Sequence, residues 1–200
     1  QFREDHIFSL DGRRMACDTQ PGTVFPASCL LRGDALTHLR AFGENEVTVQ
    51  IGAHKVCFSD ETLKLYVRRY GVDTYDPDAA IPRAYREVVT VQTDELLREL
   101  TYLKECIGSC MFPYVRFAGQ ELSMNVPSGH FMTRVSMAGR GDLAIGFNLR
   151  YMLDALKQFR KEPTVRIKLS GPYTPIVVEA EGRSDFALVL PVRLRDEMAA

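Results

Sequence analysis

The sequence lacks any apolar run approaching the roughly 18 residues that a membrane span needs, and it has no recognisable signal peptide. These two absences predict a cytoplasmic protein without a membrane partner. Hydrophobic residues make up 46% and charged residues 26% of the chain, which is typical of soluble globular proteins. Its 200 residues suffice for one or two domains with apolar cores.

The sequence also has little net charge. A formal charge of -1 argues against a protein that binds nucleic acid over its whole surface. It still allows one basic face that is balanced by acidic surface elsewhere.

Cysteines are few and odd in number: Cys17, Cys29, Cys57, Cys106 and Cys110. Five cysteines without dense pairing favour a reducing compartment over a disulfide framework. Cys106 and Cys110 are four residues apart, but no cluster of His, Asp or Cys accompanies them. We therefore expect packed thiols, with no metal site and no cofactor.

What the sequence does contain is a unit that occurs three times, each with a helix, an alternating strand, a turn and two more strands. The expected helices cover 32–42, 93–107 and 148–162, the last with Asn148 as N-cap. The expected strands cover 46–51, 55–59 and 62–69, then 114–117, 121–126 and 130–138, then 165–169, 176–179 and 186–190. Gly52, Gly119 and Gly171 each follow a first strand. The alternative is a generic α+β domain with similar hairpins.

One copy cannot bury both its helix and its sheet, so the copies should pair into domains. The irregular stretch 70–86, with Pro77 and Pro82, separates the first copy from the other two and indicates a linker. Residues 5–17, with a hairpin turn at Asp11 and Gly12, are expected to be the remnant of a partner for the first copy.

Three segments carry a family resemblance. Residues 143–156, Leu-Ala-Ile-Gly-Phe-Asn-Leu-Arg-Tyr-Met-Leu-Asp-Ala-Leu, resemble the signature IGFN-x-x-Y-L-L-D-x-L of the bacterial DNA polymerase III beta subunit, the DNA sliding clamp. Residues 190–194, Leu-Pro-Val-Arg-Leu, resemble its C-terminal M-P-M-R-L, and residues 11–16 are similar to its D-G-H-R-L-A. The first two motifs are specific and the third is weak by itself. Their order and approximate spacing match the family, and with the repeat they cover nearly the whole chain.

The resemblance implies an α+β DNA clamp fold with helices on one side of a continuous antiparallel sheet. The family's subunit has three such domains, and two subunits form a homodimeric ring around double-stranded DNA. Residues 1–85 would be most of the middle domain and 86–200 the C-terminal domain, with the first domain and the opening helix of the middle one not included. The implied role is a non-catalytic processivity factor in DNA replication.

In this family a hydrophobic cleft between the middle and last domains binds short linear motifs of the Q-L-x-L-F kind, carried by polymerase, clamp-loader and repair proteins. Apolar walls suit the Leu and Phe side chains, while an Asn and an Arg fix polar groups of the peptide. The resemblance places the cleft at Gly12, Arg14, Met15, Phe112, Asn148, Tyr151, Tyr173, Pro175, Leu188, Leu190, Pro191, Val192, Arg193 and Leu194.

Two departures from the family concern this cleft. The family's linker motif F-P-D-Y-R-R-V-I-P is replaced at 74–82 by Thr-Tyr-Asp-Pro-Asp-Ala-Ala-Ile-Pro, so a Pro and an Arg of the cleft are changed. Residues 195–200 extend beyond the family's usual terminal Leu. We therefore expect a peptide preference that differs from the family norm.

Clamp helices line the ring and face phosphates without reading base sequence. The helix at 32–42 has a net charge of +1, that at 93–107 has -2 and that at 148–162 has +2. The last is thus the best DNA-facing helix and the second the worst. The DNA-contact candidates are Arg32, Arg40, Arg150, Lys157, Arg160 and Lys161. The alternative is that these are ordinary solvated helix faces.

The sequence leaves two alternatives to the clamp function. An enzyme is disfavoured because Gly139, Gly141 and Gly146 do not have dinucleotide-binding or P-loop spacing. The histidines are scattered singly and no Ser or Cys nucleophile motif is present, so we predict no catalytic residue. The second alternative is a divergent or phage clamp-fold paralog that binds peptides as an adaptor without encircling DNA.

Overall fold

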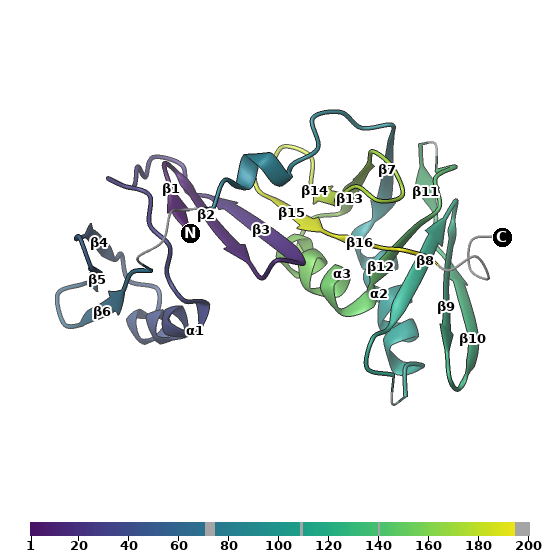
Figure 1. Cartoon of the computed structure of the whole chain (residues 1–200), viewed down its shortest axis with the longest axis horizontal. Helices are drawn as coiled ribbons and strands as arrows, with labels where there is room; N and C mark the ends of the chain where they lie inside the picture. Colours follow the sequence, from purple (N-terminus) through teal and green to yellow (C-terminus); the bar gives the residue numbers. More distant parts are fainter. Residues whose placement is uncertain (71–74, 109, 140, 195–200) are drawn as a thin grey trace. The chain divides into compact units, whose positions relative to one another are not determined.

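The computed structural model describes residues 1–70, 75–108, 110–139 and 141–194. The chain divides into two compact units, whose elements are labelled in Figure 1. Unit 1 comprises Gln1–Ser9 and Cys17–Pro77, and unit 2 comprises Leu10–Ala16 and Asp78–Ala200. Residues 71–74 of the expected linker, Arg140 and the extension at 195–200 lie outside the described residues. The domain boundary at residue 85 stays a prediction.

Unit 1 is built from short antiparallel strands and one helical segment. Strand β1 (Phe2–Arg3) pairs with β2 (His6–Leu10), which leads into β3 (Arg14–Thr19), and β4 (Thr48–Ile51), β5 (Lys55–Ser59) and β6 (Lys64–Arg68) form a meander. The expected helix at 32–42 is a single α turn, α1 (Gly33–Leu36), followed by the 3-10 helix η1 (Thr37–Phe42). Phe2, Phe25, Phe42 and Phe58 are buried in its core.

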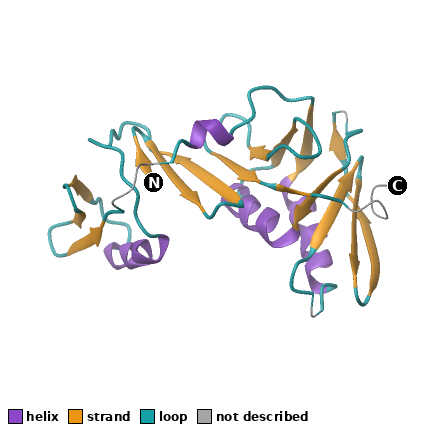
Figure 2. Cartoon of the chain, in the orientation of Figure 1, coloured by secondary structure: helices purple, strands orange, loops and turns teal. Residues whose placement is uncertain are grey.

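Unit 2 contains two helices and most of the strands (Figure 2). The helices are α2 (Thr93–Glu105) and α3 (Leu149–Leu156), which continues as the 3-10 helix η3 (Lys157–Phe159). The strands are β7 (Glu87–Gln92), β8 (Tyr114–Ala118), β9 (Glu121–Val126), β10 (Gly129–Arg134), β11 (Met137–Ala138), β12 (Ile145–Asn148), β13 (Thr164–Leu169), β14 (Ile176–Glu179), β15 (Phe186–Val189) and β16 (Pro191–Val192), and the 3-10 helix η2 (Pro77–Ala80) precedes them. The predicted α+β fold class, with repeated units of a helix and antiparallel strands, is confirmed.

The strands of unit 2 form two hydrogen-bonded sheets, where a single continuous sheet was expected. One has the order β3-β15-β14-β13-β7-β11 and the other β10-β9-β8-β12-β16. The chain leaves the first sheet after Val189, and β16 pairs with β12 in the second. Leu190 is therefore the residue at which the chain crosses between the sheets.

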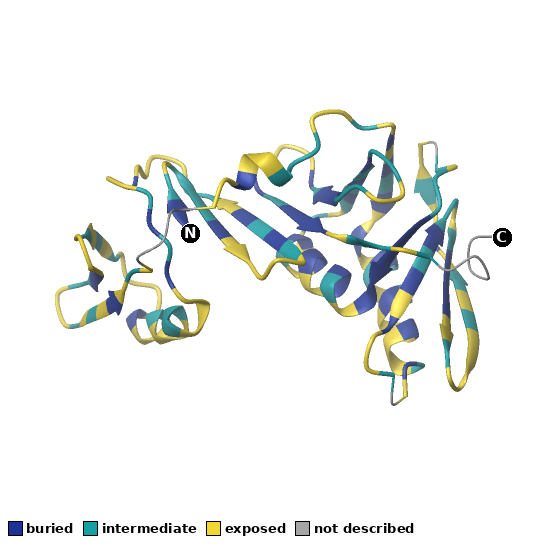
Figure 3. Ribbon diagram, in the orientation of Figure 1, coloured by how far each residue is buried: buried dark blue, intermediate teal, exposed yellow. Residues whose placement is uncertain are grey.

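Both helices and both sheets share one apolar core. Helix α2 buries Leu96, Leu100 and Leu103, which recur at helical spacing, and α3 buries Met152 and Leu156. Strands β7 and β13 alternate between buried and less buried residues along their length (Figure 3). Burying each such leucine contributes about 1.5–3 kcal/mol relative to leaving it exposed. The two helices also pack against each other.

Two of the strands that the sequence pattern does not predict, β7 and β12, each lie immediately before a helix that begins a copy of the repeat. Strand β7 pairs with β13 along its full length, from Gln92 opposite Thr164 to Glu87 opposite Leu169. Strand β12 pairs with both β8 and β16. The β-branched content of β7, Glu-Val-Val-Thr-Val-Gln, was the available signal.

Gly146 allows β16 to lie close to β12. A Cβ atom at Gly146 would lie 2.7 Å from the carbonyl oxygen of Val192 and 2.7 Å from Cδ2 of Leu194. Gly146→Ala is therefore expected to displace β16 and to lower the free energy of unfolding by about 1–3 kcal/mol, measured by urea denaturation. Gly171→Ala is the control, since its Cβ would meet only Thr174 Oγ1 at 3.7 Å. Equal urea midpoints for the two variants would contradict this explanation.

Candidate functional site

The turn between β2 and β3 is fixed by Asp11. Its Oδ1 accepts hydrogen bonds from the backbone N–H groups of Arg13 at 3.0 Å and Arg14 at 3.1 Å, and its Oδ2 accepts one from Arg14 Nε at 3.0 Å. Gly12 has φ +78°, in the left-handed region where glycine is unstrained. The Asp-Gly pair thus builds a rigid tip at Leu10–Ala16, the part of the hairpin that belongs to unit 2.

Asn148 begins α3 as predicted. Its Oδ1 accepts hydrogen bonds from the backbone N–H groups of Arg150 at 3.0 Å and Tyr151 at 3.3 Å, and the residue is 7% exposed. These bonds satisfy two of the N–H groups that a helix start leaves without partners. The side-chain oxygen is thereby committed to the helix, and the amide nitrogen of Asn148 is the group left to donate to a ligand.

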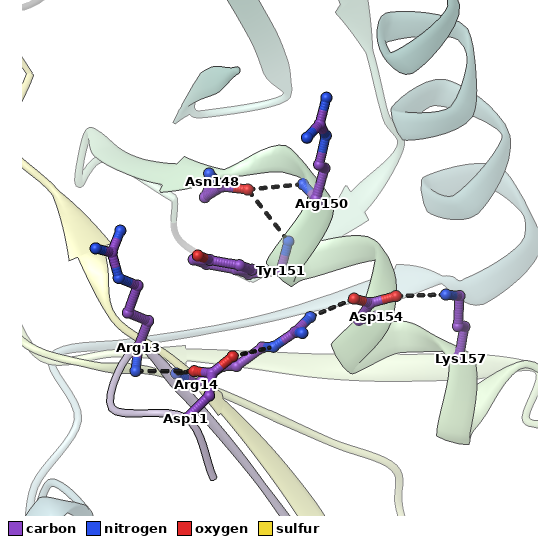
Figure 4. Close-up of polar contacts among 8 residues, drawn as sticks. All are labelled: Asp11, Arg13, Arg14, Asn148, Arg150, Tyr151, Asp154 and Lys157. Carbon is purple, nitrogen blue, oxygen red and sulfur yellow. Dashed lines mark hydrogen bonds and ion pairs between the residues drawn. The ribbon is translucent and has the colours of Figure 1, made fainter. Parts of the chain in front are cut away.

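Arg14 connects the hairpin tip to α3 (Figure 4). Its guanidinium carbon lies 4.8 Å from the ring centroid of Tyr151, a cation–π geometry. The same guanidinium donates to Asp154, three residues after Tyr151, and Asp154 also accepts from Lys157. Tyr151 is half-buried and packs against the edge of the unit 2 core. One face of its ring is therefore covered by a side chain that is itself held at two points.

The ion pair is charged at neutral pH. Burial raises the pKa of Asp154, but the hydrogen bonds from Lys157 and Arg14 outweigh burial and leave this pKa below its usual 3.8. Burial lowers the pKa of Arg14, but the hydrogen bonds to Asp154 and Asp11 raise it by more. The net shift of the Arg14 pKa is therefore upward. Because the pKa of Asp154 is depressed on folding, the stabilisation is present above the ordinary carboxyl pKa. It is lost as the pH falls through the depressed value.

The C-terminal segment reaches the same place through its backbone. The N–H of Leu190 donates to the carbonyl oxygen of Arg13 at 2.9 Å. In the pairing of β12 with β16, Gly146 lies opposite Val192 and Phe147 opposite Pro191. Leu190 directly precedes β16, and Asn148 directly follows Phe147 on β12. Leu190 is 39% exposed, so its side chain is accessible beside the start of α3.

Aromatic side chains lie next to this point. Tyr114 is the register partner of Asn148 and is 37% exposed. Phe112 precedes it by two residues and is 54% exposed, while the carbonyl oxygen of Pro113 accepts from Leu149 N at 3.0 Å. Sequence reasoning named Phe112 but missed Tyr114, because only the pairing of β8 with β12 places Tyr114 there.

The predicted cleft residues differ in how exposed they are. Met15 and Leu188 are almost fully buried, at 4% and 2% exposure. Leu188 lies opposite Val177, and it alternates with Ala187 and Val189, which belong to the core that the helices cover. Met15 and Leu188 thus offer a ligand little surface in this structure.

Other predicted residues lie on or near β16. Arg193 has its guanidinium carbon 5.5 Å from the ring centroid of Tyr173, which is 70% exposed. Pro175 directly precedes β14. The contacts described above join Arg14, Asn148, Tyr151 and Leu190 into one cluster, with Gly12, Phe112, Pro191, Val192 and Leu194 adjoining it in sequence or register. Peptide contact by these residues stays a prediction.

Among the residues that the structure describes, some of the predicted DNA-contact residues are paired with a carboxylate and others are not. Arg150, Arg160 and Lys161 are exposed, and Lys157, whose side chain is 71% exposed, is also paired with Asp154. In unit 1, Arg40 is exposed in η1, and Arg32 is paired with Asp34 through Nε at 3.0 Å.

The acidic helix α2 is less available than its net charge suggests. Glu95 accepts from the backbone N–H of Ser136 at 2.9 Å, and Glu99 accepts from the hydroxyl of Thr133 and from Arg98. The bond from Thr133 is the first cause of a lowered pKa of Glu99. These carboxylates therefore attach the helix to β10 and the residues after it.

No metal or membrane feature emerges from the part of the chain that the structure describes. Within it, no group of three or more His, Cys, Asp or Glu residues is placed to hold a metal ion, and none of the five cysteines is joined in a disulfide. None of the described helices combines the length and apolar character needed to cross a membrane.

Residues 131–193 match the family model described as the C-terminal domain of the DNA polymerase III beta subunit. The resemblance to this family is confirmed. Among solved structures, the beta subunit of Streptococcus pyogenes has a TM-score of 0.84 at 21% identity. The match covers 96% of this chain and 55% of the Streptococcus pyogenes chain. The sliding clamp of Bacillus subtilis has a TM-score of 0.81 at 20% identity, covering 97% of this chain and 55% of its own.

These structures establish the sliding-clamp fold, and the chain spans about 55% of the length of the beta subunits it resembles. The sliding clamp of Pseudomonas aeruginosa, solved with a ligand, has a TM-score of 0.81 at 20% identity. This match covers 94% of this chain and 54% of the Pseudomonas aeruginosa chain. A search of curated proteins found no match.

Proposed function

We propose that this chain works as a beta-type sliding clamp that confers processivity on a DNA polymerase without catalysing a reaction. In its complete form it encircles double-stranded DNA as a homodimer in the cytoplasm and binds short linear motifs of polymerase, clamp-loader and repair proteins. The beta-subunit match over residues 131–193 and the clamp fold support this role. Because the chain spans about half of those beta subunits, ring closure concerns the complete protein.

The observation that carries the proposal is the cluster around Tyr151. Arg14 from the hairpin tip lies over the Tyr151 ring and Asn148 caps the helix turn that carries Tyr151, while Leu190 from the sheet crossing bonds to the backbone of Arg13 beside Arg14. Exposed Phe112 and Tyr114 adjoin them. Apolar and aromatic side chains beside a few hydrogen-bonding groups suit a peptide that presents Leu and Phe side chains.

The test is calorimetric titration of a short peptide ending in Leu-Ser-Leu-Phe into the 200-residue chain. Every predicted cleft residue belongs to unit 2, so binding is expected without ring closure. A peptide of the same composition in scrambled order is the control and should give no binding heat. Equal binding of both peptides, or binding of neither, would count against the proposal.

A further inference from the structure

Asp154 has no assigned role in the cleft, yet a continuous series of contacts reaches it from the C-terminal segment. The series consists of Leu190 N to Arg13 O, Arg13 N to Asp11 Oδ1, Arg14 Nε to Asp11 Oδ2, Arg14 to Asp154 and Lys157 to Asp154. It runs past Tyr151, whose ring lies next to the guanidinium of Arg14 (Figure 4). Asp154 is where this series joins α3.

We propose that Asp154 is a positioning residue for the peptide site: it holds the guanidinium of Arg14 against Tyr151 and so fixes the surface that a partner peptide meets. The inference rests on the proposed peptide-binding function and names a further determinant of that site. Asp154 acts through Arg14, and the peptide itself is bound by the residues around Tyr151.

The geometry of the guanidinium supports this role. It is planar and donates its hydrogen bonds from its edges. Asp11 accepts from Nε and Asp154 accepts from Nη1, and the guanidinium carbon of Arg14 lies 4.8 Å from the centroid of the Tyr151 ring. With two carboxylates beside it, Arg14 next to the Tyr151 ring offers a peptide a neutralised surface suited to apolar side chains.

Preorganisation is the physical benefit. A free arginine has many rotamers, and immobilising it when a peptide binds costs free energy. Asp154 imposes this order in the unbound protein. Asp154 and Arg14 have side chains that are 39% and 33% exposed, and ion pairs at such exposure contribute little to folding. Asp154 is therefore expected to affect peptide affinity more than the melting temperature.

A double-mutant cycle tests the inference with the Leu-Ser-Leu-Phe peptide, calorimetry and thermal melts. Asp154→Asn is expected to weaken binding about three- to tenfold in the unaltered chain and less than twofold when combined with Arg14→Ala. Asp154→Glu keeps the carboxylate and should recover most of the affinity. Lys157→Ala is the matched control, because it removes the other partner of Asp154 and leaves Arg14 paired.

The outcomes separate this inference from the proposed function. If the unaltered chain binds the peptide and Asp154→Asn binds it equally well, the positioning role is wrong while the peptide site stands. If Asp154→Asn weakens peptide binding equally in the unaltered chain and in Arg14→Ala, the positioning role is also wrong, since Asp154 would then act without Arg14. If the unaltered chain does not bind, the proposed function fails first. A loss confined to the background that retains Arg14 supports the inference.

Discussion

Tyr151→Ala is expected to weaken binding of the Leu-Ser-Leu-Phe peptide by about 1–3 kcal/mol, roughly 5- to 150-fold, as truncation of an aromatic hot spot does. The ring is half-buried at the edge of the core and Arg14 covers one of its faces. Its loss removes the centre of the cluster that Asn148 and Leu190 adjoin. Folding should change little, because Met152, Leu153 and Leu156 bury the opposite side of α3.

The measurement is calorimetric titration with thermal melts of both proteins. Tyr102→Ala is the matched control: Tyr102 lies on α2, is 45% exposed and is not part of the predicted cleft, so affinity should not change. Suppose instead that the melting temperature of Tyr151→Ala collapses while the affinity per folded molecule is kept. Tyr151 would then be a core residue, and the cleft assignment would be wrong.

Periodicity predicted those elements whose buried faces are determined locally. Strands β5, β9 and β14 begin and end at the predicted residues, because their alternation is bounded by turn residues. Asn148 was recognised as the cap of α3 from its residue type. The first helix was predicted less well: Phe42 is its only buried residue, so packing does not enforce a regular α-helix over 32–42.

The candidate site depended on contacts that no local pattern encodes. Arg14 and Asp154 are 140 residues apart, and only the fold brings them together. The pairing of Tyr114 with Asn148 likewise follows from the order of β8 and β12. Family motifs indicated Arg14, Asn148 and Tyr151, but the position of Leu190 at the crossing between two sheets required the structure.

Net charge along a helix was an incomplete guide to DNA contact. The sum over 93–107 counts Glu95 and Glu99 as acidic surface, although both accept hydrogen bonds from β10 and the residues after it. The sum over 148–162 counts Lys157 as free, although it is bound to Asp154. The structure therefore favours Arg150, Arg160 and Lys161 as the side chains of unit 2 available to phosphates.

Reversing the charges of Arg150, Arg160 and Lys161 to Glu in the complete protein is expected to weaken duplex binding strongly at low salt. Each lost phosphate contact should reduce the slope of log affinity against log salt concentration by about 0.9, or about 2.7 if all three contact DNA. The affinity of the variant should approach that of the unaltered protein as salt increases. Lys157→Glu alone should have a smaller effect, because Asp154 already pairs with Lys157.

The measurement is fluorescence anisotropy of a labelled duplex at a series of salt concentrations, with two unrelated base sequences that should give equal affinities. The control reverses Lys55, Arg83 and Arg134, which are exposed, lie outside every helix and change the net charge by the same amount. If both triple variants reduce the slope equally, the effect is general electrostatics. If neither does, α3 is a solvated face. The alternative function, a peptide-binding adaptor that does not encircle DNA, would then be favoured, because its cleft would bind peptides without any contact to phosphates.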